Sequence, residues 1–180
     1  FFQSVTTRTA GFASISQSGL TNGSKLLASM LMIIGGSPAG TAGGIKTTTV
    51  AVLLLTAISV LRGNKDTECY GRKITFEIIR VGITITLVTF VFWLFGVTVM
   101  TVIEPQQKVL DLMFEATSAM ATVGLTADLT PVLSDISHVV LMLMMYIGRI
   151  GPMTMALIFS GHVDKKNQFR TLPEAKIMVG

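Results

Sequence analysis

Residues 35–46 read Gly-Gly-Ser-Pro-Ala-Gly-Thr-Ala-Gly-Gly-Ile-Lys, with five glycines and one proline. Apolar sequence bounds this stretch on both sides, over residues 26–34 and 50–61, and the two arms with the interruption are long enough to cross a bilayer. A loop at membrane depth leaves backbone N–H and C=O groups unpaired in lipid, so it occurs only inside protein or beside a water-filled path. A glycine-rich break in a hydrophobic span therefore indicates a pore or a substrate route. The alternative is a soluble loop between two short buried helices.

The composition is that of an integral membrane protein. Half of the 180 residues are hydrophobic and 13% are charged, whereas soluble domains carry about 25% charged residues. The single cysteine, Cys69, cannot form an internal disulfide. Basic residues form two clusters, and the positive-inside rule places both in the cytoplasm. They are Arg62, Lys65, Arg72, Lys73 and Arg80 after the broken span, and Lys165, Lys166, Arg170 and Lys176 near the C-terminus.

Further hydrophobic segments follow the first basic cluster. Residues 81–103 contain 23 positions without a charge, which suffices for one transmembrane helix. Residues 109–120 are too few to cross a bilayer and include Asp111 and Glu115. The last expected span, residues 138–160, carries Arg149 near its middle.

An internal repeat relates the two halves of the chain. Residues 9–12 align without a gap on residues 122–125, and the same alignment places Phe1 on Phe114. It also places Gly35 on Gly148, so that the glycine-rich break matches a break predicted at residues 148–152. We call this alignment the repeat register. Each copy thus predicts a short helix, a Thr-x-Gly turn and a span with a central break.

The two turns have the composition of an ion filter. A short helix that cannot cross must enter and return on the same side, and its C-terminal carbonyls then favour a cation. Further carbonyls from the turn can replace the hydration shell of potassium, and glycine allows the backbone angles that aim them. An ordinary helix C-cap glycine is the alternative for either copy alone. The candidate filter residues are Thr9, Ala10, Gly11, Phe12, Thr122, Val123, Gly124 and Leu125.

These motifs, with Arg149 and the ending at residues 173–180, resemble the Trk/Ktr/HKT superfamily of cation transporters. The chain is most similar to the membrane subunit of a bacterial Ktr potassium uptake system. The resemblance implies an all-α integral membrane fold. In that fold, repeated units of membrane helix, re-entrant pore loop and membrane helix surround a pseudo-fourfold pore, with a broken inner helix. The chain opens on Phe1 instead of methionine, so we expect a C-terminal fragment.

In that frame the chain divides into four parts. Residues 1–62 are the second part of pore unit three, and residues 63–73 form a cytoplasmic loop. Residues 74–163 form the complete pore unit four, and residues 164–180 form a cytoplasmic tail.

The resemblance assigns the glycine-rich break to a gate beneath the filter, contacted by an arginine of the fourth unit. For Arg149, a static anchor to loop carbonyls and a gating role both remain open, because a central arginine needs a partner in the bundle. Lys46 either extends towards the cytoplasm, which we favour, or adds a positive barrier to the closed pore. The gate residues are Gly35, Gly36, Ser37, Pro38, Ala39, Gly40, Thr41, Ala42, Gly43, Gly44, Lys46 and Arg149.

The function expected from the resemblance is potassium uptake through a gated pore in the plasma membrane. It implies a homodimer of multi-pass subunits on a cytosolic nucleotide-binding ring, with ATP and ADP bound only by that partner and sodium as an activator. No nucleophile–base set and no histidine or cysteine pair at metal-ligand spacing is present, so we expect neither an enzyme nor a metal site. Nucleic acid is not an expected partner.

Three alternatives differ from this reading. The first is a non-transporting structural or sensor subunit of a membrane complex, and the second is a sodium-selective member of the same superfamily. The third, a tetrameric potassium channel, conflicts with two unlike repeats in one chain.

Overall fold

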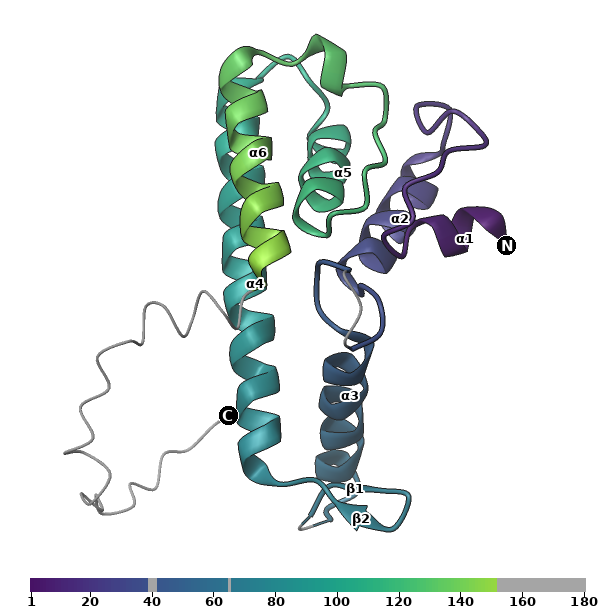
Figure 1. Cartoon of the computed structure of the whole chain (residues 1–180), viewed down its shortest axis with the longest axis vertical. Coiled ribbons are helices and arrows are strands. Elements are labelled where there is room, and N and C mark those ends of the chain that lie inside the picture. The colour runs from purple at the N-terminus through teal and green to yellow at the C-terminus, as the bar shows by residue number, and fades with distance from the viewer. Residues whose placement is uncertain (39–41, 65, 152–180) are drawn as a thin grey trace, which may run out of the picture.

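Helix α4 (Phe76–Ile103, 28 residues) runs along most of the molecule in the computed structural model (Figure 1). The structure describes residues 1–38, 42–64 and 66–151. Among the helices formed by these residues, α4 is the one that is long and apolar enough to cross a membrane. The predicted span at residues 81–103 is confirmed as part of this helix, which ends where Glu104 follows.

Threonine hydroxyls along α4 are satisfied by the helix itself. Each accepting carbonyl lies four residues earlier in the chain, at distances of 2.7–2.9 Å. A hydroxyl bonded in this way exposes no unpaired polar group to lipid. The donors are Thr84, Thr86, Thr89, Thr98 and Thr101.

The predicted broken span forms two helices, α2 (Asn22–Ile33) and α3 (Thr47–Leu61). Backbone hydrogen bonds close the base of the interruption: the Gly35 N–H donates to Ile45 O at 2.9 Å, and the Ile45 N–H donates to Ile33 O at 3.0 Å. The Thr47 N–H donates to Gly36 O at 3.2 Å. Backbone groups at the two ends of the break are therefore hydrogen-bonded to each other, where α2 ends and α3 begins.

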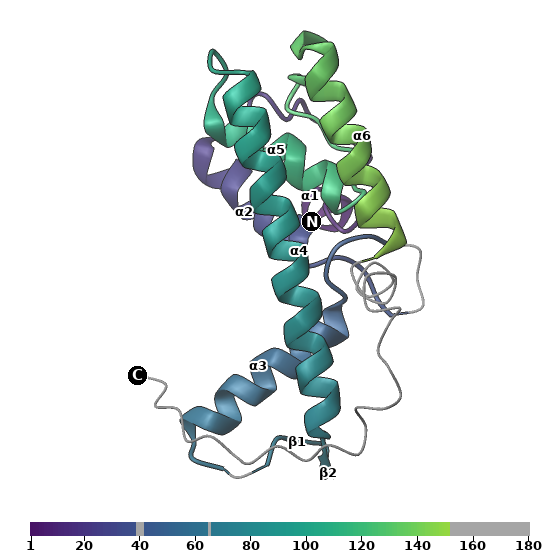
Figure 2. The ribbon, with the colours of Figure 1, turned by 90° about the vertical axis from the view of Figure 1, so that its left-hand side faces the viewer.

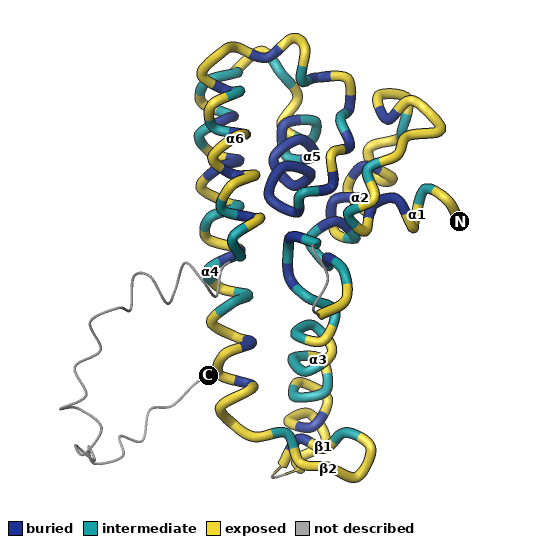
Figure 3. Tube along the Cα trace, in the orientation of Figure 1, coloured by how far each residue is buried: buried dark blue, intermediate teal, exposed yellow. Residues whose placement is uncertain are grey.

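Helix α5 (Val109–Met120) lies at the centre of the upper part of the molecule, with the bounds that the sequence predicts. It packs between α2 on one side and α4 and α6 (Asp135–Ile150) on the other (Figures 1 and 2). Most of its residues are buried, whereas α3 and the lower part of α4 have few buried residues (Figure 3). The short helix α1 (Phe2–Thr6) begins at the second residue of the chain.

Two apolar clusters hold α5 in place. The first joins α5 to α4 and α6 through residues such as Met100, Leu112 and Met144. The second joins α5 to α2 through Met32 and Phe114, which are fully buried. Since α2 belongs to the first repeat and α5 to the second, the second cluster connects the repeats.

The first basic cluster contains a small hairpin where the sequence predicts only a loop. Strand β1 (Glu68–Cys69) pairs antiparallel with β2 (Arg72–Lys73). Tyr70 and Gly71 form its tip with φ of 50° and 72°, the left-handed pair that a two-residue hairpin turn requires. A single 3-10 turn, η1 (Thr130–Val132), precedes α6.

Helix α6 ends inside the break that the sequence predicts at residues 148–152. Gly148, Arg149 and Ile150 are still helical, and the helix ends before Gly151, which has φ of 84°. Pro152 lies outside the described residues. The rest of the expected span and the C-terminal tail lie outside the described residues.

Candidate functional site

The two Thr-x-Gly turns share an uncommon backbone form. In the first turn (residues 9–12), Thr9 and Gly11 have φ of 62° and 74°; in the second turn (residues 122–125), Thr122 and Gly124 have φ of 54° and 90°. A β-branched residue with positive φ is a genuine outlier. The same outlier therefore occurs twice, at positions that the repeat register aligns.

The first and second turns lie against each other. An ideal Cβ built on Gly11 would be 2.1 Å from the carbonyl oxygen of Val123, closer than any real contact. Gly124 has nothing within 4 Å of the corresponding position. Gly11 is thus required for space and for its backbone angle, whereas Gly124 is required for its backbone angle alone.

The other predicted filter residues differ in burial. Val123 and Leu125 are buried and fix the second turn in the cluster shared with α2. Phe12 is exposed in the described part of the chain, and its carbonyl accepts a hydrogen bond from Thr6 Oγ1 at 2.6 Å. Ala10 is also exposed. The second turn is thus held by its own buried side chains, whereas the backbone of the first turn accepts a hydrogen bond from a side chain of α1.

The glycine-rich loop (residues 35–44) is seated on the second turn. The Gly43 N–H donates to Thr122 Oγ1 at 3.0 Å. A Cβ on Gly43 would lie 2.6 Å from that oxygen and 2.9 Å from Ala121 O. Gly44 has φ of +72° and passes close to Ile33 O. Of the predicted gate residues, Ala39, Gly40 and Thr41 lie outside the described residues.

The two predicted gate cations occupy different places. Lys46 Nζ donates to Ala42 O at 2.5 Å. Its amine thus reaches a carbonyl of the glycine-rich loop, and the favoured extension of Lys46 towards the cytoplasm stays a prediction. Arg149 lines a hollow together with Ser118, Thr122 and Gly124. Thr122 is the residue common to the loop contact and to this hollow.

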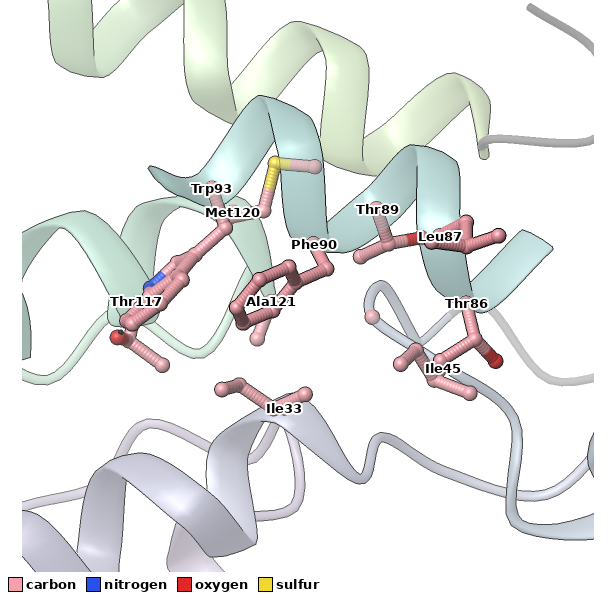
Figure 4. Close-up of a pocket in the computed structure, with 11 residues that line it drawn as sticks. Ile33, Ile45, Thr86, Leu87, Thr89, Phe90, Trp93, Thr117, Met120 and Ala121 are labelled. Carbon is pink, nitrogen blue, oxygen red and sulfur yellow. Dashed lines mark hydrogen bonds between the residues drawn. The ribbon is translucent and has the colours of Figure 1, made fainter. Parts of the chain in front are cut away.

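An apolar cavity of about 280 Å³ lies between α4, the C-terminal end of α5 and the base of the loop (Figure 4). Phe90 and Trp93 of α4 face Ile33 and Ile45 across it. Trp93 Nε1 donates to Thr117 Oγ1 at 2.8 Å. All lining residues are uncharged, so the cavity has none of the charged groups that attract cations.

Two polar contacts link the repeats, and neither is predicted by the sequence patterns. Lys25 of α2 pairs with Asp111 of α5 at 2.7 Å, with 7% and 20% of the two side chains exposed. Asp128 accepts from Ser18 Oγ at 2.6 Å and from Ser16 Oγ at 2.9 Å. The hydrogen bonds from Ser18 and Ser16 lower the pKa of Asp128. No periodicity predicts these pairs, since their partners are far apart in the chain.

A further carboxylate connects two elements within the second repeat. Glu104, at the end of α4, accepts from the Ser134 N–H at 2.8 Å and from Ser137 Oγ at 2.9 Å, at the start of α6. Hydrogen bonds from the side chain and backbone of Ser134, then from Ser137, lower the pKa of Glu104. The carboxylate satisfies a donor at the N-terminus of α6 and lies where the helix dipole favours a negative charge.

These features define a helical membrane protein built from two related helix–turn units and a broken helix. The chain belongs to the TrkH family of cation transport proteins, whose model matches residues 1–170. Family membership confirms the resemblance predicted from the sequence, and the family is one of cation transport proteins.

Individual relatives cover the whole chain. Ktr system potassium uptake protein B of Bacillus subtilis is 37% identical over 180 residues, which are 100% of this chain and 40% of the relative. Potassium/sodium uptake protein NtpJ of Enterococcus hirae is 37% identical over 183 residues, or 100% of this chain and 41% of the relative. Ktr system potassium uptake protein D of Bacillus subtilis is 33% identical over 179 residues, or 99% of this chain and 39% of the relative. The chain thus spans about two fifths of these relatives.

Proposed function

We propose that the complete protein takes up potassium across the plasma membrane through a gated, selective pore, and that this chain contributes two of its filter turns and its gate. The observation that carries the proposal is the matched pair of left-handed turns in direct contact, Thr9 with Gly11 and Thr122 with Gly124. The relatives named for potassium uptake support potassium as the cargo.

The filter would consist of backbone carbonyls at the two turns. Carbonyl oxygens of Thr9, Ala10, Thr122 and Val123 replace part of the water shell of the ion. The helices before the turns, α1 and α5, direct their C-terminal carbonyls towards the same region, which favours a cation. Two further turns of this kind, outside this chain, would complete a pseudo-fourfold ring.

The gate would be the glycine-rich loop. Its base is fixed by the bonds between residues 33–36 and 45–47, and Gly43, two residues before Ile45, donates to Thr122 of the second turn. A non-helical, glycine-rich segment between two fixed ends can adopt two arrangements at low cost. Movement of the loop away from Thr122 would then open the ion path and would at the same time remove a contact from the second turn.

Arg149 and Lys46 would hold the closed arrangement. Lys46 already donates to a loop carbonyl, and Arg149 lies in the hollow beside Thr122. An arginine has five N–H donors for the carbonyls that a non-helical loop presents. We infer that both cations stabilise the loop when the pore is closed.

The family resemblance also supports a proposal for the assembly. We infer four units per protomer, with pore unit three ending at residue 62 and pore unit four at residue 163, and residues 63–73 and 164–180 in the cytoplasm. The protomers form a homodimer on a nucleotide-binding ring that carries ATP or ADP, and sodium activates uptake. The word "system" in the relatives' names supports partner subunits.

Uptake kinetics of a Gly124→Ser variant of the complete protein test this function. A side chain at φ of +90° strains the second turn by about 1–2 kcal/mol, so the carbonyls shift and the preference for potassium over sodium falls. The measurement is the KM for each ion in cells lacking other potassium uptake. Wild-type KM values for both ions would refute the filter assignment, and absence of cation flux in the wild type would favour the structural or sensor subunit.

A further inference from the structure

Behind the second turn lies a buried carboxylate that the filter and gate assignments leave without a role. Glu115, in the middle of α5, is 4% exposed. Its surroundings in the described part of the chain consist of neutral donors, and none of the ion pairs found there includes it. A buried carboxylate is costly unless hydrogen bonds satisfy it, so its retention calls for a reason.

Among the described residues, the donors to Glu115 come from the segment that leaves the second turn. Oε1 accepts from Thr126 Oγ1 and from the Ala127 N–H, the latter at 3.0 Å. Oε2 accepts from Thr130 Oγ1 at 3.0 Å, and the Thr130 and Thr126 hydroxyls also lie 3.0 Å apart. This group, the acidic clamp, ties the middle of α5 to the segment that follows the second turn.

The first repeat contains a similar tie made of amides. Gln3 of α1 donates to Gln17 Oε1 at 2.5 Å, and Gln17 Nε2 donates to Ile15 O at 2.8 Å. Gln17 is 1% exposed. In the repeat register, Gln17 corresponds to Thr130, and Gln3 lies one position beyond the counterpart of Glu115. This group is the amide clamp.

Both clamps thus join the short helix to a point 14 or 15 residues later, across the turn. They use different chemistry at corresponding places, which indicates that the connection itself is what each repeat needs. Charge-assisted bonds are the stronger kind, so the acidic clamp holds its turn more firmly than the amide clamp.

We propose that Glu115 is a positioning residue for ion selectivity: through Thr126, Ala127 and Thr130 it fixes the carbonyls of the second turn at the spacing that prefers potassium. This inference rests on the proposed function. A fixed cage discriminates ions by size only if its oxygens resist moving inwards around a smaller ion, one of the two explanations given for such filters. The clamp supplies that resistance from behind the turn.

Uptake by the complete transporter with Glu115→Leu, Glu115→Gln, or the pair Thr126→Val and Thr130→Val tests the proposal. The readout is the ratio of the KM for sodium to the KM for potassium, with membrane protein measured by immunoblot. A hydrogen bond to a charged group corresponds to roughly tenfold or more in an equilibrium. We expect the ratio to fall roughly tenfold in Glu115→Leu and to fall in the double threonine variant.

Glu115→Gln separates hydrogen bonding from charge. Its side-chain oxygen can accept from Ala127 and its amide can donate to Thr130 Oγ1, so its ratio should lie closer to the wild type than that of Glu115→Leu. Thr98→Val is the matched control, because its exposed hydroxyl bonds only to Leu94 O within α4. A purely structural role would lower protein level and maximal rate and leave the KM ratio unchanged.

The Gly124→Ser variant distinguishes a failure of the role proposed for Glu115 from a failure of the filter assignment. If Gly124→Ser lowers the ratio while Glu115→Leu and the double threonine variant both keep the wild-type ratio, the clamp is overturned and the filter stands. If Gly124→Ser leaves the ratio unchanged, the filter assignment itself is wrong. Should Glu115→Leu fail to accumulate, the double threonine variant decides alone, since valine closely matches threonine in shape.

Discussion

Single glycines in this chain serve different physical needs. Gly124 has open space around its Cα and is required for a positive φ. Gly148 has an ordinary helical φ, but a Cβ there would lie 1.9 Å from the carbonyl oxygen of Met120. Gly11 meets both restrictions. The sequence pattern predicts that these glycines matter, yet only the packed structure separates the need for an angle from the need for space.

Gly148→Ala should destabilise the protein by forcing α6 away from the end of α5. Overpacking of this kind costs about 1–3 kcal/mol, since backbone atoms cannot move aside as a flexible side-chain tip can. The measurement is the Tm of the purified complete protein in detergent. Gly23→Ala in α2 is the matched control, because nothing lies within 4 Å of its Cβ position. Equal Tm values for the two variants would contradict the packing described for Gly148.

At the scale of elements, α5 is the part on which the others depend. It contacts α2, α4 and α6, carries Glu115 and ends at the second turn. Its position explains why a helix too short to cross the membrane is nevertheless the most buried one. The glycine-rich loop differs, because beyond its base it is tied to the molecule by hydrogen bonds such as those from Gly43 to Thr122 and from Lys46 to Ala42.

Deletion of residues 38–43 should therefore raise potassium flux and weaken its dependence on the regulatory partner. The deletion removes the Gly43 donor to Thr122 and the Ala42 acceptor of Lys46. Arg149→Ala should act in the same direction if the arginine latches the loop, and should lower protein levels if it is mainly an anchor. Flux is measured as initial uptake rate per membrane-inserted transporter. An unchanged or reduced rate at normal expression would rule out the loop as a gate.

The sequence predicts elements well where one physical rule dominates. Residues 109–120 are apolar, bounded by polar residues and too few to cross, and they form α5 with those limits. The hairpin is missed because its Tyr70-Gly71 tip lacks the Asn-Gly or Asp-Gly signal of such turns. The two clamps are missed because Gln17 and Thr130 find their partners only after the chain folds back. Amphipathic patterns carry no information about these pairs.

On the scale of the whole molecule, the repeat is the organising feature. The repeat register aligns the two turns, and the structure gives both turns the same pattern of positive φ angles. At the second break, α6 continues through Arg149 to Ile150 and ends before Gly151, within the predicted residues 148–152. Two repeats joined by a cytoplasmic hairpin would place both turns on the outer side of the membrane and α3 on the inner side.

Cys69 tests this orientation. It lies in β1 of the hairpin, and the basic residues around it should keep the hairpin in the cytoplasm. A membrane-impermeant thiol reagent added to intact cells should leave Cys69 unlabelled and should label it after permeabilisation. The control is a Cys69→Ser variant with Ser14→Cys, an exposed position just after the first turn, which should react from outside. The reverse pattern would invert the topology.

The claim that both turns line one cation path is tested most directly by anomalous diffraction from crystals of the complete protein soaked with thallium or rubidium. Both ions substitute for potassium and scatter strongly enough to be located individually. We expect a peak coordinated by carbonyls of the first turn and the second turn together, next to the contact between Gly11 and Val123. Peaks found elsewhere, with none at these two turns, would contradict the claim.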